Sequence, residues 1–171
     1  MFESLAESSL LRVTLVLLTA LGVQTSLLAQ VRPFGGIVDL LALLAAMAGL
    51  IAGPRRGARA AFMFGIGFDL LIATPFGIKG LSYGLAAFAV GMLPDEPIVN
   101  VRFLVPMTAA GGAALAVLTE GVVATVFGRS GALSRDLLAS IIVTSAVAAL
   151  LAPPMKRTVR WAMMSADRAR F

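Results

Sequence analysis

The chain has 171 residues, of which 59% are hydrophobic and 13% charged, and its formal net charge is +5. Soluble domains are usually about a quarter charged, so the composition indicates a polytopic membrane protein with a single domain over residues 1–171. The absence of histidine and cysteine excludes disulfides, Cys/His zinc sites and Ser-His-Asp catalysis. We expect no enzymatic activity, cofactor, metal or bound nucleic acid, and interpret the excess of Lys and Arg as a signal of membrane orientation.

Six apolar segments are predicted to form transmembrane helices in one compact, all-α bundle. They span approximately residues 13–29, 37–52, 60–73, 78–93, 103–127 and 137–152. A span through lipid needs about 20 residues, so the third and fourth segments are short. Clusters of Gly and Pro separate the segments: Gly53 and Pro54 end the second, and Pro153 and Pro154 are expected to stop the last.

Loop charges predict the orientation of the bundle. Six spans place both termini on one side, and that side then holds ten of the 14 Lys and Arg residues. The positive-inside rule places this side in the cytoplasm. It includes the Arg55–Arg59 loop and a basic tail at residues 155–171. The tail is interpreted either as a segment lying on an anionic leaflet or as a frayed stop-transfer end.

Small residues recur at helical spacing on several segments, and in lipid such residues allow helix backbones to approach closely. The candidate packing positions are Gly65, Gly80, Gly84, Gly91, Gly112 and Gly128. We therefore predict a tight bundle. We also expect a partner helix to pack on one of these faces, with Gly80 and Gly84 as the first candidates.

Five polar residues fall in the outer half of the predicted bundle: Gln24, Asp39, Asp69, Lys79 and Glu120. A charge at the bilayer centre costs about 2.5–3.5 kcal/mol or more, so such residues are candidate functional groups. One interpretation is a polar pocket or docking site that opens outward. The other is structural, with Asp39 as a helix N-cap and Asp69 paired with Lys79 across a short turn. For Glu120 both interpretations remain open.

Several short motifs run through residues 12–93. They are Val23-Gln24-Thr25-Ser26-Leu27-Leu28, Val38-Asp39-Leu40-Leu41, Gly53-Pro54-Arg55-Arg56-Gly57, Gly65-Ile66-Gly67-Phe68-Asp69-Leu70-Leu71, Thr74-Pro75-Phe76-Gly77 and Leu81-Ser82-Tyr83-Gly84. Together they resemble the MreD family of bacterial rod-shape proteins, although Val38 stands where that family usually has Pro. After residue 93 the resemblance is one of hydropathy alone.

This resemblance implies a non-catalytic scaffold or regulatory subunit in the bacterial cytoplasmic (inner) membrane. Its direct partner would be an MreC-type membrane protein. A SEDS glycosyltransferase, a class B penicillin-binding protein and MreB would belong to the same peptidoglycan-synthesis assembly. The fold of the family resembles the six-helix S-component of ECF vitamin transporters. That likeness supplies the alternative function, a substrate-binding transporter subunit.

Overall fold

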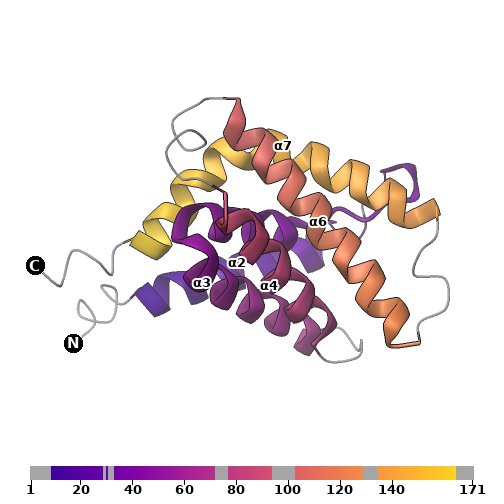
Figure 1. Ribbon diagram of the computed structural model, residues 1–171, viewed down its shortest axis with the longest axis horizontal. Coiled ribbons are helices and arrows are strands. Elements are labelled where there is room, and N and C mark those ends of the chain that lie inside the picture. Colours follow the sequence, from indigo (N-terminus) through magenta and orange to yellow (C-terminus); the bar gives the residue numbers. More distant parts are fainter. Residues whose placement is uncertain are drawn as a thin grey trace, which may run out of the picture.

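The computed structural model describes residues 9–28, 30, 33–71, 77–93, 103–128 and 135–164. All regular secondary structure in these ranges is helical, and the helices pack into one bundle (Figure 1). The elements are α2 (Ser9–Val23), the π-helical turn η1 (Gln24–Leu28), the 3-10 turn η2 (Pro33–Gly35), α3 (Leu40–Leu71), α4 (Ile78–Gly91), α6 (Leu104–Val126) and α7 (Arg135–Met164). Residues 74–76 of the predicted Thr74-Pro75-Phe76-Gly77 turn and the end of the basic tail at 165–171 lie outside the described residues.

Four helical stretches are long and apolar enough to cross a membrane: Leu11–Leu28, Leu40–Leu71, Leu104–Val126 and Asp136–Met163. The chain therefore has the character of a helical membrane protein, as predicted. By length and composition, however, the predicted count of six spans is wrong. The segments predicted at 37–52 and 60–73 are the two halves of α3, which meet at a break at Gly53, and α4 has only 14 residues.

The long element α3 reverses its direction at Gly53, which has φ 75° and ψ 178°. A Cβ atom built on Gly57 would lie 2.5 Å from the Ala48 carbonyl oxygen. In a straight helix, residues 48 and 57 would be about 13 Å apart. The two halves of α3 therefore fold back on each other, because Gly53 adopts a left-handed φ that other residues disfavour and Pro54 starts a new helix.

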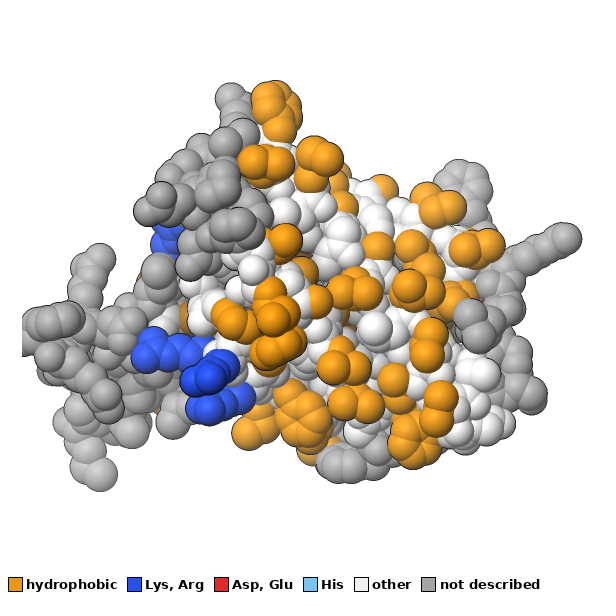
Figure 2. Space-filling view, in the orientation of Figure 1, with side chains coloured by type: hydrophobic (Ala, Val, Ile, Leu, Met, Phe, Trp, Pro, Cys, Tyr) orange, Lys and Arg blue, Asp and Glu red, His pale blue; other side chains and the backbone are white. Residues whose placement is uncertain are grey.

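The first half of α3 is the centre of the bundle. Every residue from 40 to 50 is buried, and Leu41, Leu44 and Met47 are among the largest side chains that are fully enclosed. Large apolar side chains on the other helices remain exposed over much of the outer surface (Figure 2). A helix enclosed by protein need not match the thickness of the lipid, which explains why its apolar stretch is shorter than a lipid-facing span.

Glycines permit the closest helix contacts, as predicted, but the contacts lie within the chain. A Cβ atom on Gly65 would lie 2.4 Å from the Lys79 and Gly80 backbone, so α3 and α4 touch there. Gly80 and Gly84 are buried against the side chains of α3, which corrects the expectation that they face a partner. Five of the six predicted glycines lie at such internal contacts: Gly65, Gly80, Gly84, Gly91 and Gly112.

Gly128 was predicted to lie on a helix-packing face, but its role in the structure is different. A Cβ atom there would meet nothing within 4 Å, and its φ is +80°. Its N–H donates to the Thr125 carbonyl at 3.0 Å, just after α6 has ended at Val126. Gly128 therefore terminates α6 in the left-handed conformation that commonly ends helices.

The helix α7 continues through Pro153 and Pro154, contrary to the expected stop, and ends at Met164. Both prolines are exposed, so their rings stand away from the neighbouring helices. Beyond them, Val159 and Ala162 are each only 2% exposed and belong to the core. Burial of these apolar residues offsets the backbone hydrogen bonds that proline removes.

Candidate functional site

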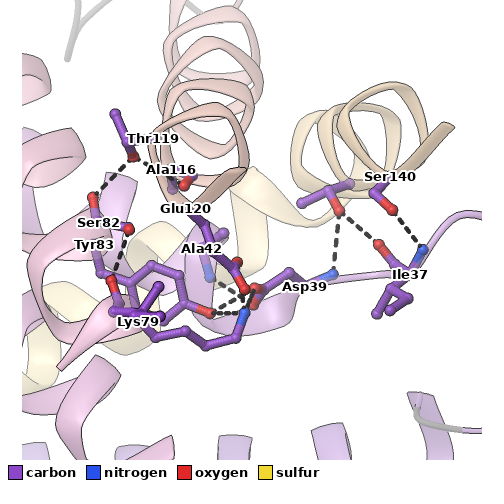
Figure 3. Close-up of polar contacts among 12 residues, drawn as sticks. Ile37, Asp39, Ala42, Lys79, Ser82, Tyr83, Ala116, Thr119, Glu120 and Ser140 are labelled. Carbon is purple, nitrogen blue, oxygen red and sulfur yellow. Dashed lines mark hydrogen bonds and ion pairs between the residues drawn. The ribbon is translucent and has the colours of Figure 1, made fainter. Parts of the chain in front are cut away.

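Four polar side chains meet at the end of the bundle opposite the Gly53 reversal (Figure 3). They are Asp39 before α3, Lys79 and Tyr83 in α4, and Glu120 in α6. The Lys79 ammonium lies 2.9 Å from Asp39 Oδ2 and 2.7 Å from Glu120 Oε2. It also donates to the Tyr83 hydroxyl at 3.2 Å, and that hydroxyl donates to Asp39. We call these four residues the lysine cluster.

Burial of the lysine cluster is uneven. The side chains of Asp39 and Lys79 are only 6% and 14% exposed, whereas that of Glu120 is 27% exposed. Tyr83 is fully buried, and the Lys79 ammonium also lies 4.8 Å from the centre of the Phe68 ring. Lys79 is thus surrounded by two carboxylates, a phenol and an aromatic face, all of which favour a cation. Glu120 is the member nearest to the surface.

Asp39 reaches the lysine cluster from a short non-helical segment, residues 36–39. Its Oδ1 accepts the Ala42 N–H at 3.0 Å, which is the N-cap predicted for it. Gln24 bonds the backbone on both sides of Asp39. Its Nε2 donates to the Val38 carbonyl at 2.7 Å, and its Oε1 accepts the Leu40 N–H at 2.9 Å. Gln24 therefore positions Asp39 without binding its carboxylate.

The helix α7 holds the same segment from its other side. Thr144 accepts the Asp39 N–H at 3.2 Å and donates to the Ile37 carbonyl at 3.0 Å. Ser140 accepts the Ile37 N–H at 3.0 Å (Figure 3). A Cβ atom on Gly36 would lie 2.6 Å from the Ala139 backbone, so the segment touches α7 directly. These bonds replace the helical ones that a non-helical backbone lacks at this depth.

Asp69 stabilises the corner between α3 and α4 in a different way from the one predicted. Its Oδ2 accepts the backbone N–H groups of Gly77, Lys79 and Gly80 at 3.0, 3.1 and 3.4 Å. These are unpaired donors of the first turn of α4, whose own N-cap residue, Gly77, offers no side chain. Asp69 thus contacts the Lys79 backbone, while the Lys79 ammonium pairs with Asp39 and Glu120.

Asp69→Ala is expected to lower the free energy of unfolding by about 1–3 kcal/mol, because three helix-terminal N–H groups lose their acceptor. Asp69→Asn keeps one acceptor oxygen and is expected to lose less. Thermal unfolding in detergent, followed by circular dichroism, measures both. Asp136→Ala is the control, since Asp136 is exposed and surface changes are usually within about 0.5 kcal/mol. Equal losses for Asp69→Ala and the control would contradict the capping role.

Sequence reasoning found Gln24, Asp39, Lys79 and Glu120 but did not assign roles to Tyr83, Ser140 and Thr144. Tyr83 is the only tyrosine in the chain, and it follows Lys79 by four residues, one helical turn. That spacing was a usable signal. The α7 hydroxyls gave none, because Ser and Thr are common in apolar helices.

The lysine cluster is best suited to holding helices together. One ammonium joins α4 to the start of α3 and to α6, and no buried side-chain N or O atom in the described part of the chain lacks a hydrogen-bond partner. In the same ranges, no three His, Cys, Asp or Glu side chains lie close enough to hold a metal ion. With Lys79 paired to two carboxylates, the ionised cluster carries a net charge of −1.

Comparisons with protein-family models, with curated proteins and with solved structures find no match to this chain. The resemblance to the MreD family, and the S-component-like fold that it implies, therefore stay predictions.

Proposed function

We propose that the chain is a non-catalytic membrane subunit of the MreD type. It would act in bacterial cell elongation by binding an MreC-type partner within the membrane. The observation that supports this most directly is the use of its polar side chains. Asp39, Lys79 and Glu120 bond one another across three helices, and Asp69 and Gln24 bond the backbone. Such an arrangement fits a scaffold better than a reaction centre.

In the proposed orientation, both termini of the chain lie on the cytoplasmic side of a bacterial inner membrane. The start of α2 and the end of α7 lie together, since the Arg12 guanidinium lies 5.0 Å from the centre of the Trp161 ring. The basic Arg55–Arg59 stretch follows the reversal at Gly53, which Gly91 contacts from the end of α4. The positive-inside rule supports the direction.

The alternative, a substrate-binding transporter subunit, is not favoured by the same contacts. A ligand pocket needs convergent polar groups that face the ligand. Gln24 and Asp39 instead bond the backbone and side chains of α3 and α4. We therefore retain the scaffold as the proposed function.

The function is tested by purifying the tagged chain in mild detergent and identifying its partners by mass spectrometry. We expect a single-span, MreC-type protein at a stoichiometric level, and loss of rod shape when the chain is depleted from its host. Co-purification of an ATPase module with a bound vitamin would contradict the proposal and support the transporter subunit.

Photo-crosslinking locates the partner face. A photoreactive residue is placed at one exposed leucine on each of four helices: Leu18 in α2 (63% exposed), Leu85 in α4 (48%), Leu118 in α6 (42%) and Leu150 in α7 (77%). A single-span partner can cover only one face, so crosslinks should concentrate at one or two neighbouring sites. The other sites serve as controls. Equal crosslinking at all four would indicate non-specific proximity.

A further inference from the structure

Charge is strongly segregated along the bundle. Seven of the nine Lys and Arg residues in the described ranges lie at the end of the bundle where α2 starts, α3 reverses and α7 finishes. Figure 2 shows the blue side chains of Lys and Arg gathered at one end of the molecule. The seven residues are Arg12, Arg55, Arg56, Arg59, Lys156, Arg157 and Arg160, and we call them the basic collar. The four acidic residues in the same ranges, Asp39, Asp69, Glu120 and Asp136, lie toward the opposite end.

The most defined part of the basic collar is the last turns of α7. Arg157, Arg160 and Trp161 are exposed and follow one another at helical spacing on one face. The indole of Trp161 is 50% exposed, and the Arg12 guanidinium from α2 lies 5.0 Å from its ring centre. Cation–π contact of this kind holds the Arg12 side chain against the indole, on the face of α7 that also carries the exposed Arg157 and Arg160.

An exposed apolar surface continues from this basic face. Leu150, 77% exposed, lies seven residues before Arg157 and so occupies the same side of α7 two turns away. Guanidinium groups beside an indole suit a phosphate headgroup, and a lipid-facing leucine about 10 Å along the helix suits the acyl chain attached to it. The ligand that fits both is a phospholipid.

We propose that the basic collar binds anionic phospholipid headgroups, with Arg157 and Arg160 beside Trp161 as its central part. Arginine suits phosphate oxygens because its planar fork donates two parallel hydrogen bonds. Tryptophan is enriched at the depth of the headgroups. Anionic lipid is present at that depth wherever the bundle spans its membrane, whereas an acidic protein partner would not explain the adjoining leucine. The inference does not depend on the proposed partner.

The chain contains one tryptophan, so its fluorescence reports on this surface alone. The purified full-length chain is reconstituted into phosphatidylcholine vesicles that contain brominated phosphatidylglycerol or, separately, brominated phosphatidylcholine at the same mole fraction. Bromine quenches Trp161 when the brominated lipid is next to it. We expect the anionic lipid to bind about threefold more strongly or better, since each basic residue near an anionic surface adds roughly a fivefold attraction. High salt should reduce the preference.

Arg157→Gln with Arg160→Gln should bring the preference close to equality. Arg157→Lys with Arg160→Lys retains the charge and should keep most of it. Arg135→Gln, which removes a charge from the opposite end of the same helix, should leave it unchanged. Circular dichroism of each variant checks that the fold is kept. Equal quenching by the two brominated lipids in the wild type would overturn the proposal and leave the surface to an acidic protein partner. A preference that survives in the double Gln variant would also overturn it, because Arg157 and Arg160 would then not bind the headgroups.

Discussion

Lys79→Met is expected to destabilise the bundle by about 3–5 kcal/mol, because removal of one partner leaves buried carboxylates without a counter-charge. Lys79 is the only cation within 4 Å of the Asp39 and Glu120 carboxylates among the described residues. Methionine keeps most of the side-chain volume, so the loss reports on charge and hydrogen bonding. Thermal unfolding of the purified chain in detergent measures the effect.

Arg157→Met likewise replaces a cation by methionine at the opposite end of the bundle, where Arg157 is exposed, and serves as the control. Its cost should stay near 0.5 kcal/mol, as is usual at surface positions. The double variant Lys79→Met with Glu120→Gln also removes one of the two carboxylates that lose their counter-charge. Its loss of unfolding free energy should therefore be smaller than the sum of the two single losses. Additive losses would show that Lys79 and Glu120 do not couple.

Gly112→Ala and Gly111→Ala, adjacent changes in α6, are expected to have opposite effects on stability. A Cβ atom on Gly112 would lie 2.6 Å from Ala46 Cβ and 2.7 Å from Val90 Cγ2. Ala46 belongs to the enclosed half of α3 and has no rotamer to change, so α6 must shift. We expect a loss of about 1–3 kcal/mol, as for other overpacked cores.

At Gly111 the new Cβ atom meets nothing within 4 Å. Alanine is favoured over glycine inside a helix by up to about 1 kcal/mol, so Gly111→Ala should be neutral or stabilising. The two variants share helix propensity and hydrophobicity, and differ only in what the methyl group contacts. Thermal unfolding compares them directly. A similar melting temperature for both would mean that α6 does not pack against α3 at Gly112.

The difference between the predicted and observed partners of Lys79 has a simple cause. Asp69 and Lys79 lie on either side of a short turn, and their separation of ten residues suggested an ion pair. The observed ammonium partners, Asp39 and Glu120, are 40 and 41 residues away. Only the packing of three helices makes these distances short, and no local pattern contains that information.

The break at Gly53-Pro54 was predicted from residue types, and the predicted spans on either side of it already implied that the chain folds back there. Glycine before proline indicates that a helix ends. By itself it does not say whether the chain continues outward or folds back beside itself. The reversal depends on Gly57, which lets the second half of α3 touch the backbone of the first at Ala48. At Pro153 and Pro154 the predicted stop was wrong, because burial of Val159 and Ala162 carries α7 onward.

The sequence by itself determined the membrane character of the chain, its helical class and the segregation of its basic residues. It also placed Asp39 and Lys79 among the polar residues in the outer half of the bundle. These follow from composition and periodicity, which each segment carries locally. The tertiary structure decided which segments are enclosed, which glycines face other helices, and that one lysine joins Asp39 to Glu120. Those outcomes depend on contacts between residues far apart in the chain, because close packing and ion pairing are properties of surfaces that meet only when the helices assemble.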